Sequence, residues 1–300
     1  MKELFIIYNP SAGRQWEQDK VFEIARQVQV KTNWIVSLYA TKGPKDAEDM
    51  AATMIERDVD IVMACGGDGT IHEVINGLMQ YEKRPRLAIL PAGTVNDFAR
   101  QLKLPNSVGD VVDMLLDEQV QIVDIGKVND RFFINVAAGG AFTSIAHELA
   151  SEWKTWFGRL AYYVQGAVKM PEEISKSYLL TFETPEKTFT VDTLLFLVSN
   201  TASVGGFSRA LPDASYQDGK FDCLVIEQAP IPELMEIFTR FLMGIHVQHS
   251  KVHHFQTQDL IINGLSSVPL DVDGERGDLL PVQFHMEPGA IELIVSAESL

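Results

Sequence analysis

Gly66-Gly67-Asp68-Gly69-Thr70 is the segment that decides the fold of this 300-residue chain. It follows an apolar run, Ile61 to Ala64, and precedes a stretch with apolar residues at helical spacing: Ile71, Val74, Ile75 and Leu78. Glycines let backbone N–H groups approach an anion closely, and a helix N-terminus adds partial positive charge. We therefore expect a phosphate-binding turn between a strand and a helix.

The carboxylate of Asp68 sits where a phosphate alone would not favour it. A divalent cation between the carboxylate and a polyphosphate removes that conflict, which favours a magnesium nucleotide over free phosphate. The alternative for this motif by itself is a glycine-rich turn with a solvated aspartate.

Three further small-residue turns follow apolar runs in the first half of the chain. They are Asn9-Pro10-Ser11-Ala12-Gly13 after Leu4 to Tyr8, Thr41-Lys42-Gly43 after Trp34 to Ala40, and Pro91-Ala92-Gly93-Thr94-Val95-Asn96-Asp97 after Leu87 to Leu90. Strands alternating with helices imply right-handed βαβ units on a doubly wound parallel sheet. All four turns would then meet at the carboxyl edge of the sheet, where ligands bind.

The second half of the chain has a different pattern, typical of antiparallel strands. Hairpin signals occur at Asn129-Asp130 and Thr184-Pro185-Glu186. Further strands are expected at 193–199, 221–227, 259–262, 281–286 and 291–295, and helical stretches at about 142–170 and 232–247. We predict an α/β domain over 1–122 and a mainly antiparallel β domain over 123–300, with the last residues able to pack back on the first domain.

Composition limits the partners and the compartment. The net charge of −16 argues against nucleic acid and would repel an anionic membrane from most of the surface. Cys65 and Cys223 both lie in apolar runs and are expected to be buried thiols, which suits a reducing cytoplasm. No signal pattern opens the chain and no apolar run approaches 18 residues, so we expect a protein that visits a membrane at most.

Five motifs in order resemble the diacylglycerol kinase catalytic family, specifically the soluble bacterial lipid kinases. They are the segments 9–13, 66–70 and 91–97, then Pro212-Asp213-Ala214 to Asp218-Gly219, and Asp273-Gly274-Glu275. The resemblance covers nearly the whole chain and implies an NAD kinase/diacylglycerol kinase-like fold. It also implies ATP and Mg²⁺ as co-substrate and cofactor. The ATP-binding positions would be Asn9, Pro10, Ser11, Ala12, Gly13, Thr41, Gly66, Gly67, Asp68, Gly69, Thr70, Ile71, His72, Glu73 and Thr94.

Two magnesium sites follow from the resemblance. Asp68, Asp97 and Asp124 would organise a catalytic ion, partly through water, although an aspartate at such a position can instead cap a helix or form a turn. A structural Mg²⁺ would bind the Asp218 side chain and the backbone carbonyls of Ser215 and Lys220. An Asp-Gly turn without metal is the alternative there.

The general base would lie in Asp273-Gly274-Glu275, although Asp-Gly is also the commonest hairpin dipeptide. One sequence does not decide which carboxylate takes the proton. We favour Glu275 as the base and keep Asp273 as an orienting or alternative group.

Membrane contact is expected from a stretch in which aromatic and basic residues alternate. It contains Trp153, Lys154, Trp156, Phe157, Arg159, Leu160, Tyr162, Tyr163 and Lys169, although core packing also explains most of these aromatics. Arg14 and Arg100 follow two of the turns and are candidates to neutralise phosphate charge. We expect a lipid substrate at the inner face of the membrane, no nucleic acid, and a homodimer as a family prior.

The sequence therefore predicts an ATP- and Mg²⁺-dependent lipid kinase, with diacylglycerol as the favoured acceptor. An NAD kinase-like or other small-molecule alcohol kinase is the rival, because NAD kinases and phosphofructokinases share a Gly-Gly-Asp-Gly turn. A non-catalytic lipid or nucleotide sensor is the alternative from another class. Intact Asp68, Asp97 and Glu275 argue against that sensor.

Overall fold

The computed structural model describes residues 1–12, 15–93, 96–140, 177–204, 210–265 and 268–299. The chain forms two compact units, of which the first comprises Met1–Ile125 and Pro288–Leu300 and the second Gly126–Glu287. The chain passes from one unit to the other within strand β5 (Val120–Val128) and returns within strand β15 (Val282–Ile294). The helix expected at about 142–170 lies outside the described residues.

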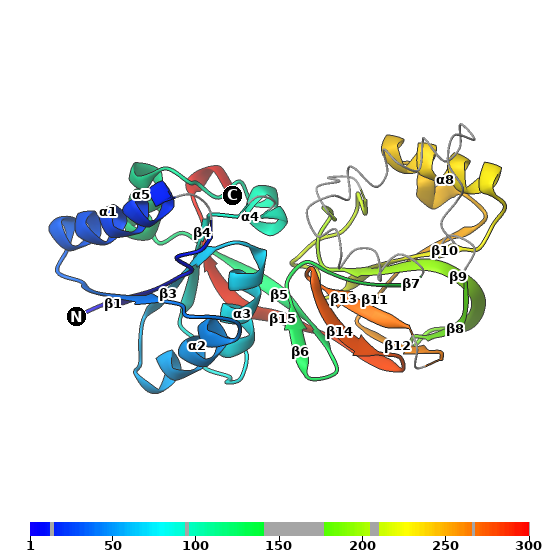
Figure 1. Cartoon of the computed structure of the whole chain (residues 1–300), viewed down its shortest axis with the longest axis horizontal. Coiled ribbons are helices and arrows are strands. Elements are labelled where there is room, and N and C mark those ends of the chain that lie inside the picture. The colour runs from blue at the N-terminus through cyan, green and yellow to red at the C-terminus, as the bar shows by residue number, and fades with distance from the viewer. Residues whose placement is uncertain (13–14, 94–95, 141–176, 205–209, 266–267, 300) are drawn as a thin grey trace. The chain divides into compact units, whose positions relative to one another are not determined.

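The first unit is an α/β domain with a parallel sheet, as the sequence predicts. Its strand order is β15-β4-β3-β1-β2, and all four neighbouring pairs are parallel. Figure 1 shows α1 and α5 on one side of this sheet and α2 and α3 on the other. The elements are β1 (Glu3–Tyr8), α1 (Gln15–Lys31), β2 (Ile35–Ala40), α2 (Asp46–Glu56), β3 (Ile61–Gly66), α3 (Asp68–Leu78), β4 (Arg86–Pro91), α4 (Asp97–Gln101), α5 (Val108–Asp117) and a terminal 3₁₀ turn η3 (Ala297–Ser299).

The burial of each strand follows its place in the sheet. All six residues of the central strand β3 are buried, which matches its uninterrupted apolar sequence and its helix-covered faces. The edge strand β2 has no fully buried residue. Helices α2 and α3 approach closely at Gly77, where a Cβ atom would lie 2.3 Å from the backbone oxygen of Glu48. The absence of a side chain at Gly77 allows the two helices to pack closely.

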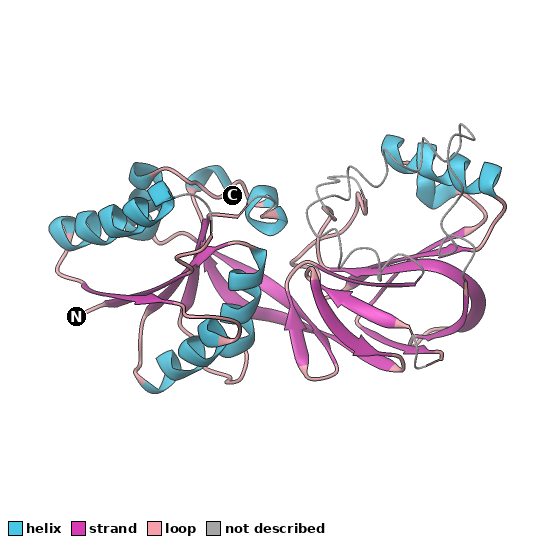
Figure 2. Ribbon diagram, in the orientation of Figure 1, coloured by secondary structure: helices cyan, strands magenta, loops and turns pink. Residues whose placement is uncertain are grey.

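The second unit is mainly antiparallel β structure, coloured magenta in Figure 2 apart from the cyan helix α8. Strand β9 is central and pairs antiparallel with β7, β8 and β10. The elements are β6 (Arg131–Phe133), β7 (Val136–Gly140), β8 (Tyr178–Glu183), β9 (Thr188–Ser199), β10 (Phe221–Glu227), α8 (Ile231–Met243), a 3₁₀ turn η2 (His246–Gln248), β11 (Val252–Thr257), β12 (Asp259–Asn263), β13 (Pro269–Val272) and β14 (Glu275–Leu279).

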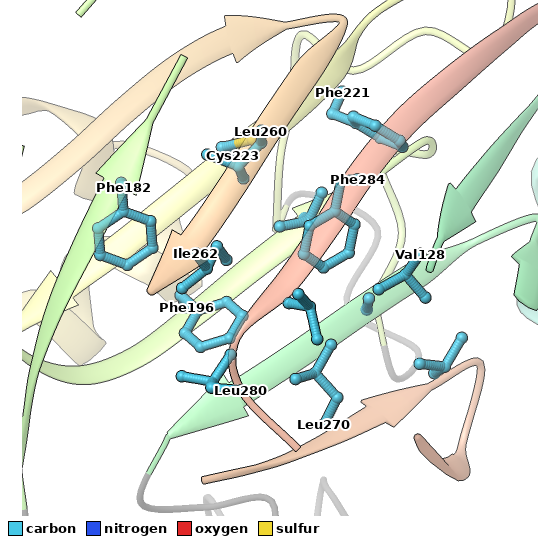
Figure 3. Packing of buried hydrophobic residues seen from close by; sticks show 14 of the residues in the cluster. Val128, Phe182, Phe196, Phe221, Cys223, Leu260, Ile262, Leu270, Leu280 and Phe284 are labelled. Atoms are coloured by element: carbon cyan, nitrogen blue, oxygen red, sulfur yellow. The ribbon is translucent and has the colours of Figure 1, made fainter. Parts of the chain in front are cut away.

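Two apolar clusters stabilise this unit, one on each face of β9. Phe196 and Val198 belong to the larger cluster, whose aromatic members include Phe182, Phe221 and Phe284 (Figure 3). Leu197, on the opposite face, packs in a second cluster with Ile237 of α8. The alternation of side chains along one strand thus fills two cores.

Several predictions are confirmed, and one is corrected. The two hairpins form at the predicted turns, with Val128 opposite Arg131 and Glu183 opposite Thr188. Cys65 and Cys223 are free and buried, and burial raises the pKa of both thiols. The separate strands expected at 281–286 and 291–295 are one strand, β15. Glu287-Pro288-Gly289 inside it resembles a turn, but the left-handed Gly289 (φ 62°) lies within the continuous strand.

Candidate active site

The loops after β1, β3 and β4 are linked by hydrogen bonds at the carboxyl edge of the parallel sheet. The Asn9 amide donates to the Cys65 carbonyl at 3.0 Å, which places the first loop against β3. The Asn9 side chain accepts from the Ser11 amide at 2.8 Å and donates to the Thr70 hydroxyl at 3.4 Å. Asn9 therefore shapes its own loop and joins it to the start of α3.

Glycines at this edge are required by close backbone contact. The Ala92 amide donates to the Gly66 carbonyl at 2.8 Å. A Cβ atom on Gly93 would lie 2.6 Å from the Cα of Gly67, and one on Gly66 would lie 2.5 Å from the Thr70 hydroxyl oxygen. No side chain fits in either place, so the backbone itself forms this surface.

Helix α3 begins at this surface without a side-chain cap. Its N-cap is Gly67, which has no side-chain oxygen to offer to the first-turn amides, and Asp68 is the first helical residue. The Asp68 carboxylate accepts from the Asn96 amide at 2.9 Å and so joins the helix start to the loop after β4. Asn96 has a left-handed backbone (φ 48°), a conformation that asparagine tolerates well.

A pocket of about 200 Å³ opens beside the loop after β4. Arg100 contributes a cation to its wall, and Asn96 and Asn106 contribute amide groups. The full lining is Pro91, Ala92, Gly93, Asn96, Ala99, Arg100, Leu104 and Asn106. Polar groups around a small-residue loop suit part of a phosphorylated ligand.

Three of the residues predicted to bind ATP make contacts within the fold. Ile71 and His72 are 2% and 3% exposed, and the Ile71 amide donates to the Gly67 carbonyl within the helix. Both oxygens of Glu73 accept backbone amides from the start of α2, Lys45 at 2.8 Å and Ala47 at 3.1 Å. Glu73 thus joins α3 to the start of α2.

Of the other predicted positions, some lie at the loops and the helix start of this edge, and the rest lie outside the described residues. Pro10, Ser11 and Ala12 form the half-exposed or exposed loop after β1, and the Thr41 amide donates to the Tyr8 carbonyl at 2.9 Å, just beyond β2. Gly69 lies in the first turn of α3. Gly13 and Thr94 lie outside the described residues, as do Arg14 and the aromatic stretch from Trp153 to Lys169.

The three aspartates predicted to organise the catalytic ion occupy different environments. Asp97 and Asp124 are 5% and 3% exposed. Asp97 is the first residue of α4, whose N-cap is Asn96, so Asp97 is not the cap that the alternative proposed. Asp124 lies in β5 and accepts from the Gly289 amide at 2.7 Å. Among the described residues, no group of three or more His, Cys, Asp or Glu side chains could hold a metal ion.

The predicted structural-magnesium segment forms a tight turn in the second unit. The Asp218 carboxylate accepts from the Lys220 amide at 3.1 Å, and the Ser215 hydroxyl accepts from the Gln217 amide at 3.3 Å. Gly219 between them is left-handed, with φ 72°. Such side-chain-to-backbone bonds are those of an Asp-Gly turn. The backbone carbonyls of Ser215 and Lys220, the other two predicted ligands, belong to the same segment.

Asp273 and Glu275 lie at the hairpin between β13 and β14 but have different surroundings. The Asp273 carboxylate accepts the amides of Ile134, Asn135 and Val136 at 2.9, 3.0 and 2.9 Å. Its backbone is left-handed, with φ 52°. Both of its oxygens are thus used to hold the chain at the start of β7.

Glu275 is half-buried and is paired with a cation. Its carboxylate lies 3.0 Å from the guanidinium of Arg131, and the side chain is 41% exposed. Arg131 also donates to the Arg276 carbonyl at 2.8 Å. Sequence reasoning missed Arg131, because its pairing with Glu275 depends on a contact between strands far apart in the chain.

None of the described helices has the length and apolar content that a membrane crossing requires.

Comparison with known proteins gives two domain matches and relatives that align over most of the chain. Residues 3–128 match the diacylglycerol kinase catalytic domain, and residues 135–295 match the YegS C-terminal NAD kinase β-sandwich-like domain. A diacylglycerol kinase of Staphylococcus haemolyticus is 39% identical over 93% of this chain and 84% of its own length. One from Staphylococcus aureus is 36% identical over 99% and 95%.

A solved structure of similar architecture comes from Bacillus anthracis strain Sterne, a candidate diacylglycerol kinase. It is 25% identical, with a TM-score of 0.82 over 100% of this chain and 96% of its own. Two domain matches in sequence order, relatives that align over nearly the whole chain, and a common fold lead to one assignment. This chain belongs to the diacylglycerol kinase family.

Proposed function

We propose that the protein transfers the γ-phosphoryl group of ATP to the hydroxyl of diacylglycerol, in a Mg²⁺-dependent reaction that yields phosphatidic acid. The uncapped start of α3, to which two neighbouring loops are bonded through Thr70 and Asp68, is the observation that carries the proposal. Relatives named diacylglycerol kinase support the choice of acceptor.

The first unit binds the nucleotide in this proposal. Backbone amides at Gly67 to Thr70 face the phosphates, because the glycines admit close approach and the helix start favours negative charge. Asn9 and Ser11 add polar groups from the loop after β1. Arg100, in the wall of the adjoining pocket, neutralises phosphate charge.

The aspartates fit a magnesium ion bound mainly through the nucleotide and water. Mg²⁺ prefers oxygen ligands and retains several waters, and it is usually held by one or two carboxylates together with substrate phosphates. Asp68 would hold the ion, with Asp97 and Asp124 acting through water. The bound ion would shield the phosphate charge during transfer.

Glu275 acts as the general base. Its carboxylate accepts the proton of the lipid hydroxyl while the oxygen of that hydroxyl forms a bond to the γ-phosphorus and the bond to ADP breaks. Arg131 orients the carboxylate through their 3.0 Å ion pair. Asp273 serves as a positioning residue, because both of its oxygens are occupied by backbone amides.

The protein works at the surface of the membrane in this proposal, as a peripheral cytoplasmic enzyme with a lipid partner, no nucleic acid and a homodimeric state. A structural Mg²⁺ at Ser215, Asp218 and Lys220 belongs to the same proposal. Hard oxygen donors on a tight turn support it.

Transfer of labelled γ-phosphate from ATP to lipid alcohols in mixed micelles tests the function, with NAD and fructose 6-phosphate as soluble acceptors. Label in phosphatidic acid is expected, and Asp68→Ala should fold normally and transfer none. Label in another lipid would correct the acceptor, and label only in NAD phosphate or in a sugar phosphate would refute the lipid kinase.

A further inference from the structure

We infer that Glu73 is a positioning residue that fixes the loop between β2 and α2, and with it Thr41, relative to the phosphate-binding turn. This inference rests on the proposed function for the identity of the nucleotide. It assigns to Glu73 a role behind the site in place of direct contact with ATP.

The residue at the N-cap position of α2 has no side-chain acceptor for the helix amides. The Lys45 carbonyl accepts the first helical bond, from the Asp49 amide at 3.0 Å, which makes Lys45 the cap residue. A lysine side chain has no oxygen to offer to the free amides, and the backbone of Lys45 is left-handed (φ 67°). Glu73 supplies the missing acceptors from the neighbouring helix, one oxygen to Lys45 and the other to Ala47.

Asp46, the first residue of α2, holds the end of the same loop that follows β2. One of its oxygens accepts the Lys42 amide at 2.7 Å, and the other accepts the Tyr39 hydroxyl at 2.9 Å. The bond to Asp46 raises the pKa of the Tyr39 hydroxyl, which keeps that donor protonated. Thr41 therefore lies in a segment fixed on both sides by a carboxylate.

Helix α3 connects this loop to the rest of the site. Asp68 holds the loop after β4 through Asn96, Thr70 holds the loop after β1 through Asn9, and Glu73 holds the loop after β2. The three side chains come from the first six residues of one helix. Because α2 and α3 are closely packed at Gly77, a shift of one loop would have to move the helix that starts at the phosphate turn.

Steady-state kinetics of Glu73→Ala and Glu73→Gln test the inference, with Asp49→Ala as the matched control. Asp49 is an exposed carboxylate in the same first turn of α2, so its removal takes a favourable charge from the helix without freeing the loop. Glu73→Ala should raise the KM for ATP about tenfold and change kcat by less than about twofold. The loss of a hydrogen bond to a charged group changes an equilibrium constant by about tenfold.

The other variants separate positioning from helix stability. Glu73→Gln retains one acceptor oxygen and should raise KM only about threefold. Asp49→Ala should leave both KM and kcat unchanged. An unchanged KM in Glu73→Ala would overturn the inference, and so would an equal rise in Asp49→Ala.

Direct nucleotide binding distinguishes this inference from the proposed function. Calorimetry with MgATP and no lipid should give a tenfold weaker Kd for Glu73→Ala than for the wild type, and amide exchange at Lys45 and Ala47 should accelerate. A wild type that binds and a variant that binds equally well would refute the positioning role alone. A wild type that binds no ATP would refute both.

Discussion

Asp273→Ala tests whether Asp273 holds the hairpin that carries Glu275. The substitution removes an acceptor shared by three backbone amides, those of Ile134, Asn135 and Val136. A hydrogen bond to a charged group contributes ~1.5–3 kcal/mol, and three bonds to one carboxylate are not additive. We expect a loss of ~3–5 kcal/mol of unfolding free energy, which lowers the Tm of a domain of this size class by about 10 °C.

Two companion variants resolve the loss into its causes. Asp273→Asn keeps one acceptor oxygen and tolerates the left-handed backbone, so about 1–2 kcal/mol should be lost. Asp273→Gly removes the same hydrogen bonds as Asp273→Ala but relieves the strain of φ 52°, and should be ~1 kcal/mol more stable than the alanine variant. Thermal and urea unfolding of the three proteins measure these differences.

Activity decides between a positioning and a chemical role. We expect Asp273→Asn to retain phosphoryl transfer within about tenfold of the wild type, since Glu275 remains the base. The reasoning would be refuted by an alanine variant that melts with the wild type. A well-folded asparagine variant with no transfer would also refute it, because it would identify Asp273 as the base.

Three further predictions concern packing, pH and thiol reactivity. Gly93→Ala places a Cβ atom 2.6 Å from the Gly67 Cα, so it should lower stability by ~2 kcal/mol or more and weaken ATP binding; a wild-type melting curve would contradict the close contact. Bonds from Lys251 and His253 lower the pKa of Glu227, so the stability that they contribute is present above its ordinary value of 4.5 and is lost as the pH falls below it. Acid titration should therefore destabilise the wild type more than Glu227→Gln, and parallel curves would refute this. Cys65 and Cys223 should not react with a thiol reagent in the native protein and should react in urea, since burial raises the pKa of both; fast native labelling would contradict that burial.

Local sequence patterns were sufficient for the parallel sheet and its loops. The apolar run 61–64 followed by glycines and a helical repeat fixes a strand, a turn and a helix in one short segment, because each signal is local. The hairpin at Asn129-Asp130 is specified in the same way by its turn residues.

Contacts between segments far apart in the chain could not be predicted from local sequence patterns. The strands β11 and β14 are rich in polar residues without a regular alternation and were missed, because their partners β10 and β13 decide their register. The pairing of Arg131 with Glu275 joins two hairpins far apart in sequence. Glu73 was placed with the ATP ligands because it continues their motif, and its bonds to the amides of Lys45 and Ala47 could not be read from that motif.

The central claim is that Glu275 is the base of an ATP-dependent lipid kinase. The most direct measurement compares transfer of γ-phosphate to diacylglycerol by the wild type and by Glu275→Gln, with MgATP affinity measured in parallel. Loss of the base should reduce kcat by about 10²–10⁴-fold while the Kd for MgATP stays unchanged. Equal transfer by both proteins, or no transfer to diacylglycerol by the wild type, would contradict the account.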